Sequence, residues 1–145
     1  MVDVLAFQLG ESRCAFPVPD VQEVLPVVAL SPIPGQEPPL EGMLNLRGSM
    51  LPVFDLRACF GLASVRWTER TRIIVVNAQH GRIGVIVDHV EDVIKMNETE
   101  ETASAPVGNQ KMVGAIQNVG GKALTLLRPG ELIHDRQLSA VHLQP

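Results

Sequence analysis

Short apolar runs, separated by turn-forming residues, recur along the chain. The runs are rich in Val, Ile, Leu and Phe, and Gly, Asn, Asp or Pro stands between them, which is typical of strands joined by tight turns. No long stretch shows helical periodicity, so the pattern predicts a mainly β fold built as small barrels or a sandwich. The predicted strands lie near residues 4–9, 14–18, 43–46, 50–56, 72–78, 82–87, 112–117 and 122–127.

The second half of the chain repeats the pattern of the first. The matching segments are 4–7 with 73–76, 14–24 with 83–93, and 50–54 with 123–127. Such self-similarity indicates two related units, near residues 4–60 and 73–133, within a single domain that spans 1–145. Strands can be exchanged between the units, so the sequence halves need not equal the spatial barrels.

Two segments depart from the strand pattern. In each copy a predicted strand runs into apolar residues at helical spacing, which indicates a short helical segment. These residues are Val21, Val24 and Leu25 in the first copy, and Val90, Val93 and Ile94 in the second. Just before the first of them, Pro17 and Pro19 flank Val18. Proline lacks a backbone N–H, so this point can only be a strand end or a sheet edge.

The stretch GMLNLRGSMLPVFDLR places a charge, Arg47, inside an apolar run. A charged side chain in such a run needs an ion-pair or hydrogen-bond partner, or a position at an edge that is exposed to water. Asn45 is suited to capping a turn there. The repeat aligns Arg47 with Gly120, so the arginine is present in one copy only. At the end of the stretch, Asp55 and Arg57 are expected to form a surface pair.

Composition narrows the function classes. The 145 residues carry a net charge of −4, with 46% hydrophobic and 3% aromatic residues and no Tyr. A folded chain of this charge, with few rings for base stacking, is poorly suited to nucleic acid. No apolar run is long enough to cross a bilayer, and no basic secretion leader is visible. Cys14 and Cys59 form no paired motif and are expected to be reduced and buried in the cytosol.

Motifs of catalysis and metal binding are missing from the sequence. It contains neither GxSxG nor HExxH. GGKAL is not a phosphate-binding loop, because Ala123 replaces the Ser or Thr that holds magnesium and Ile116 replaces the first glycine. The histidines, which lack ligand spacing, are His80, His89, His134 and His142. We therefore expect no enzyme activity, no cofactor and no metal site.

The segment EGMLNLRGSMLPVFDLR resembles the signature of the CheW family of bacterial chemotaxis coupling proteins. Residues 4–24 resemble the opening strands of that family, and residues 81–94 resemble the matching part of its second half. The resemblance covers nearly the whole chain. It implies two SH3-like, five-stranded β-barrels packed around a shared core, which agrees with the internal repeat.

This resemblance implies a non-catalytic adaptor in the cytoplasm, at membrane-associated chemoreceptor arrays. Such adaptors bridge the cytoplasmic tip of a methyl-accepting chemoreceptor and the regulatory domain of a CheA-type histidine kinase. The helical receptor tip docks in an apolar groove between the barrels. By position, the implied groove residues are Glu23, Val24, Arg47, Met50, Val85 and Val87. The implied kinase-binding edge consists of Leu5, Val18 and Val21. Glu23 and Arg47 are implied to be paired charges at the groove rim.

Two alternatives stay open. Pro17 and Pro19 are unusual for the family, and they argue against kinase binding through this edge because prolines block pairing between sheet edges. The chain can therefore be a CheW-like paralogue that binds receptor without recruiting kinase. An alternative of another class is a small β-barrel that binds nucleic acid or a small ligand, which the acidic charge disfavours.

Overall fold

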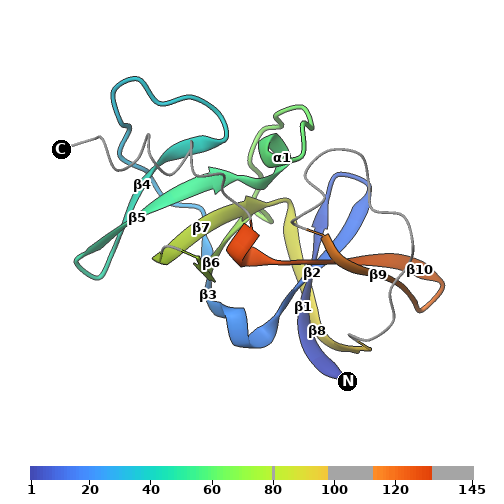
Figure 1. Ribbon diagram of the computed structural model, residues 1–145. Coiled ribbons are helices and arrows are strands. Elements are labelled where there is room, and N and C mark those ends of the chain that lie inside the picture. Colours follow the sequence, from blue (N-terminus) through green and yellow to red (C-terminus); the bar gives the residue numbers. More distant parts are fainter. Residues whose placement is uncertain (80, 98–112, 132–145) are drawn as a thin grey trace.

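The computed structural model describes residues 1–79, 81–97 and 113–131. This part contains ten strands and three short helical segments (Figure 1). The strands are β1 Val2–Leu9, β2 Ser12–Pro17, β3 Val21–Pro26, β4 Leu40–Leu46, β5 Ser49–Asp55, β6 Arg72–Ala78, β7 Gly81–Val87, β8 His89–Met96, β9 Val113–Val119 and β10 Lys122–Leu127. The helical segments are η1 Val18–Asp20, α1 Leu56–Cys59 and η3 Pro129–Glu131.

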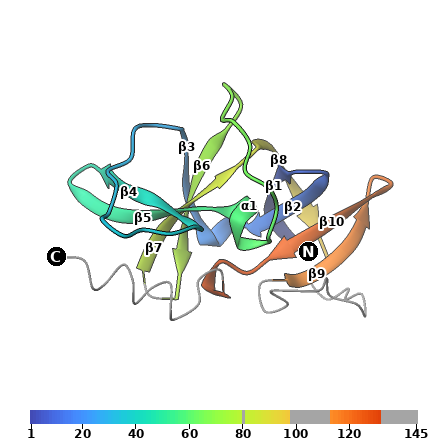
Figure 2. The same ribbon diagram turned by 90° about the horizontal axis from the view of Figure 1, so that it is seen from above.

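The strands form two five-stranded sheets. Sheet 1 has the order β8-β1-β2-β10-β9, and sheet 2 has the order β3-β6-β7-β5-β4. Figure 2, a view from above, shows the two sheets side by side with α1 between them. The predicted mainly β fold with two five-stranded units is confirmed, and all eight predicted strands are present.

The prediction of short helical segments at residues 21–25 and 90–94 is wrong, because these residues belong to strands, β3 and β8. Each carries a bulge. The partner register shifts between Val21 and Glu23 in β3, and β8 spans Val90 to Val93 opposite only Leu5 to Phe7 of β1. Burial in β3 nevertheless alternates from residue to residue, and Val24 and Val93 are exposed, at 38% and 58%. These exposed valines add to the apolar residues of the inner face, so apolar side chains recur at three- and four-residue intervals as they would in a helix.

The internal repeat explains the order of the strands. It matches β1 to β5 with β6 to β10, and this matching converts the strand order of sheet 1 into that of sheet 2. Each sheet contains strands of both copies, because β1 and β2 lie with β8, β9 and β10. The chain therefore crosses between the sheets twice, at η1 and at Asp88, the residue between β7 and β8.

A shared core fills the space between the sheets. One face of β1 directs Leu5 and Phe7 into it, while the other face directs Val4 and Ala6 into a smaller core within sheet 1. The ring of Phe7 packs 4.9 Å from that of Phe16 on β2. Sheet 2 has its own smaller core in the same way. Strands covered on both faces need apolar residues at successive positions, as in the run Ile73 to Val76 of β6.

The carboxylate of Asp88 ties the second crossing to two other parts of the chain. It accepts hydrogen bonds from Nε and Nη2 of Arg57 at 2.9 and 2.8 Å, and from the backbone N–H of Gly10 at 2.8 Å. The backbone N–H of Asp88 donates to Gln8 O at 3.1 Å. Hydrogen bonds to an ionised carboxylate are among the stronger ones in proteins. Chiefly the bond from Arg57 lowers the pKa of Asp88.

Asp88 is a partner that the sequence analysis missed. Asp55, expected to pair with Arg57 at the surface, is buried and instead caps α1 by accepting the Arg57 backbone N–H at 3.0 Å. The Arg57 guanidinium binds Asp88, and it also donates to Ala63 O at 3.1 Å. These contacts hold α1, the β1–β2 turn and the β7–β8 crossing in one cluster.

Substituting Asp88→Asn is expected to lower the free energy of unfolding by about 2 kcal/mol at pH 7, because charged hydrogen bonds are weakened. The folded-state pKa of Asp88 lies below its unfolded value, so its ionised form stabilises the fold above about pH 4. That contribution is lost as pH falls through the folded pKa. Urea unfolding should therefore show that the difference in free energy of unfolding between wild type and variant becomes smaller from pH 7 to pH 3. Asp92→Asn, at an exposed position of β8, is the control. An equal difference at both pH values would contradict this role of Asp88.

Candidate functional site

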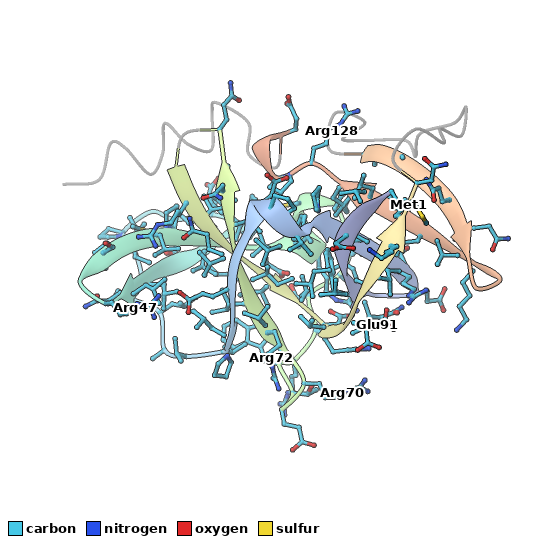
Figure 3. All side chains as sticks on the ribbon, turned by 90° about the horizontal axis from the view of Figure 1, so that it is seen from below. Met1, Arg47, Arg70, Arg72, Glu91 and Arg128 are labelled. Carbon is cyan, nitrogen blue, oxygen red and sulfur yellow. The ribbon has the colours of Figure 1, made fainter. Side chains whose placement is uncertain are left out.

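The turn between β4 and β5 places Arg47 at the closed end of a hairpin. Arg47 and Gly48 occupy its centre, with φ of 51° and 88°. The side-chain Oδ1 of Asn45 accepts the backbone N–H of Gly48 at 3.0 Å, so the predicted capping of a turn by Asn45 is confirmed. Figure 3 shows Arg47 at the end of this hairpin, on the opposite side of the view from Glu91 of sheet 1.

Arg47 binds Glu23 across the barrel, and the predicted pairing of these two charges is confirmed. Nη2 of Arg47 donates to Oε1 of Glu23, and Nη1 lies 3.5 Å from Oε2. Glu23 belongs to β3 and Arg47 follows β4, the two edge strands of sheet 2. Ser31, in the segment between β3 and β4, forms an isolated bridge with Met43 of β4. The hydrogen bond to Glu23 raises the pKa of Arg47.

Solvent limits what this ion pair contributes to folding. The side chain of Arg47 is 69% exposed, and that of Glu23 is 27% exposed. Water and salt screen such a pair, and holding two long side chains in one geometry costs entropy. The pair is therefore better suited to presenting the Arg47 guanidinium at the surface than to stabilising the barrel.

Two large apolar side chains are exposed close to the pair in the sequence. Val24 follows Glu23 on β3 and is 38% exposed, and Met50 of β5, three residues after Arg47, is 53% exposed. Methionine is flexible and polarisable, which suits adaptable contact surfaces. We call Glu23, Val24, Arg47 and Met50 the Arg47 surface.

Val85 and Val87, assigned to the groove with the Arg47 surface, require a correction. Both lie on β7, a strand with β6 on one side and β5 on the other, and both are buried in the shared core with 0% and 1% exposure. A fully buried side chain presents no area to a partner. The apolar part of the surface is therefore limited to Val24 and Met50.

The residues of the predicted kinase-binding edge differ in how deeply they are buried. Val18 in η1 is 36% exposed, Val21 at the start of β3 is partly buried, and Leu5 lies in the shared core. Pro17 ends β2, as its missing N–H predicted. Leu5 offers little surface, so η1 and the start of β3 are the accessible part of this edge.

Two surface features were not predicted. The first is a cavity of about 800 Å³ on sheet 1, where Arg13 and Glu91 form an ion pair of 2.8 Å. Gly120, the counterpart of Arg47, lines it. The second is a group of exposed apolar side chains between α1 and β6, namely Leu62, Val65 and Trp67. These three residues lie outside the predicted strands, so no periodic pattern in the sequence indicated an apolar surface there.

Within residues 1–79, 81–97 and 113–131, no three His, Cys, Asp or Glu side chains gather as a metal site would require. His80, His134 and His142 lie outside these ranges. Burial raises the pKa of both Cys14 and Cys59 to about 12, which keeps the thiols protonated near neutral pH. In the same ranges, no helix has the length and apolar character needed to span a membrane.

Comparison with known proteins gives matches along almost the entire chain. The family model of the CheW-like domain matches residues 3–137. The chemotaxis protein CheW of Bacillus subtilis is 36% identical over 108 residues, which cover 74% of this chain and 69% of that protein. The chemotaxis protein CheW of Helicobacter pylori is 25% identical over 138 residues, covering 92% and 82% of the two chains.

A solved structure shows the same architecture. The crystal structure of the scaffolding protein TtCheW from Thermoanaerobacter tengcongensis superposes with a TM-score of 0.85. The match covers 94% of each chain at 28% sequence identity.

Both cysteines are expected to resist alkylation in the folded protein. With a pKa of about 12, the thiolate is scarce at pH 8, so iodoacetamide should react at least roughly a hundredfold more slowly than with a free thiol. Mass spectrometry over time measures the modified fraction, and the urea-unfolded chain serves as the reactive control. Cys14 is buried, as expected, whereas Cys59 is only partly buried. Rapid modification of either thiol under native conditions would contradict the raised pKa values.

Proposed function

Because the chain belongs to the CheW-like domain family, we propose that it is a non-catalytic adaptor of bacterial chemosensory signalling. In this proposal the whole chain, residues 1–145, acts as one domain. It couples the cytoplasmic tip of a methyl-accepting chemoreceptor to a CheA-type histidine kinase, in the cytoplasm at membrane-associated receptor arrays. It needs no cofactor and does not insert into the membrane.

The observation that carries the receptor half of the proposal is the Arg47 surface. It consists of an ion pair and two exposed apolar side chains that are close to the pair in the sequence, Val24 and Met50. A helical receptor tip presents apolar anchors along one face, flanked by polar residues. Val24 and Met50 can cover such anchors, while the charges of Glu23 and Arg47 fix the orientation of the helix.

For the kinase half, the proposed contact is the accessible part of the predicted edge. Val18 supplies an exposed apolar side chain there, and Val21 a partly buried one. Leu5 underlies them from the shared core. Such a contact relies on side chains, since Pro17 and Pro19 offer no backbone donor for strand pairing.

The same prolines favour a second candidate function. If kinase binding required backbone pairing at η1, this chain would bind receptor without recruiting kinase. Pro17 at the end of β2 and Pro19 inside η1 both lack the N–H that such pairing uses. This alternative keeps the Arg47 surface and removes one partner.

Equilibrium binding to two purified partners tests the proposal. A receptor cytoplasmic fragment and the kinase regulatory domain are each titrated against the full chain. Binding of both supports the coupling adaptor, and binding of the receptor alone supports the receptor-only paralogue. Binding of neither would overturn both proposals.

Substituting Met50→Ser is expected to weaken receptor binding about tenfold and to leave kinase binding unchanged. Burying a methionine side chain contributes roughly 1.5–3 kcal/mol, and tenfold in affinity corresponds to about 1.4 kcal/mol. Leu62→Ser is the matched control, because Leu62 is 41% exposed but lies in the link after α1. Equal effects of the two substitutions on the receptor titration would rule out a specific role for Met50.

A further inference from the structure

The two hairpin turns related by the repeat have the same backbone but different side chains. In the β4–β5 turn, Arg47 and Gly48 have φ of 51° and 88°, and in the β9–β10 turn, Gly120 and Gly121 have φ of 63° and 85°. An asparagine stands on the strand before each turn, two residues ahead of the first residue with positive φ. Asn45 accepts the N–H of Gly48 at 3.0 Å, and Asn118, its counterpart, accepts the N–H of Gly121 at 3.0 Å.

Positive φ at two consecutive central residues is the mark of a type I′ hairpin turn. Glycine adopts this left-handed region at no steric cost, whereas a residue with a Cβ is disfavoured there. The β9–β10 turn satisfies this demand with Gly120. In the β4–β5 turn, Arg47 stands at the equivalent place and is the only non-glycine residue with positive φ among the described residues.

A stability contribution from the side chain does not account for this choice. Arg47 makes one ion pair, with Glu23, and its side chain is 69% exposed. In the β9–β10 turn no such pair exists, because Gly120 has no side chain, and the hairpin still forms. The barrel therefore does not need an arginine at this turn in order to fold.

We propose that the β4–β5 turn gives up stability to hold Arg47 in place for its partner, and that Asn45 is the positioning residue. By accepting the Gly48 N–H, Asn45 fixes the left-handed turn, and the turn aims the guanidinium at Glu23. A pre-aimed arginine loses less freedom on binding, which improves affinity without adding a contact. The binding half of this inference rests on the proposed function, while the stability half does not.

The stability half is tested by comparing Arg47→Gly with Arg47→Ala. Both lose the guanidinium, but only glycine relaxes the turn. The glycine variant should melt about 2–5 °C higher than the alanine variant, although glycine usually lowers stability. Gly120→Ala should lower the melting temperature by a similar amount. Equal melting of the two Arg47 variants, or a higher value for alanine, would overturn the inference.

The binding half compares equivalent substitutions in the two turns. Asn45→Ala should weaken binding of the receptor fragment about fivefold, and Asn45→Asp, which keeps an acceptor oxygen, should restore most of it. Asn118→Ala removes the same hydrogen bond from the other hairpin and should leave receptor binding unchanged. Wild-type binding by Asn45→Ala, no recovery in Asn45→Asp, or an equal loss in Asn118→Ala would each overturn the positioning role.

Arg47→Ala separates this inference from the proposed function. If it binds the receptor fragment as the wild type does, the Arg47 surface is not the receptor site, and the positioning role is overturned with it. If it loses binding while Asn45→Ala does not, the proposed function stands and only the positioning role is overturned.

Discussion

The two crossings of the chain between its sheets are the constraint on which the rest of the structure depends. Because the chain changes sheets at η1 and again at Asp88, neither sheet is complete without strands from both copies of the repeat. The core between the sheets must therefore form together with them, and Phe7, Phe16 and Phe54 all contribute to it. Asp88 fixes the second crossing through Arg57 and Gly10.

Within this symmetric frame, the proposed function depends on what differs between the halves. Both barrels have a hairpin closed by the same asparagine-stabilised turn. Only one turn carries an arginine, and only that arginine meets Glu23. The equivalent place on sheet 1 is a cavity lined by Gly120. A duplicated fold can keep one copy of a turn optimal for stability and change the other for recognition.

Sequence patterns were sufficient for most strands, for the repeat and for the turn at Asn45. They failed at β3 and β8, where the exposed side chains of Val24 and Val93 give an apolar spacing like that of a helix. They also failed for Val85 and Val87, because family resemblance transfers a position but not its burial. The role of Asp88 could not be predicted, because its partners Arg57 and Gly10 are distant in sequence and meet it only in the folded chain.

The central claim is that the Arg47 surface of sheet 2 receives the chemoreceptor tip. Its most direct test is to map backbone amide chemical shifts of the full chain during titration with a receptor cytoplasmic fragment. The account predicts the largest changes at Val24, Arg47 and Met50, with little change at Glu91 and Lys95 of sheet 1. Changes centred on sheet 1, with the Arg47 surface unaffected, would contradict it.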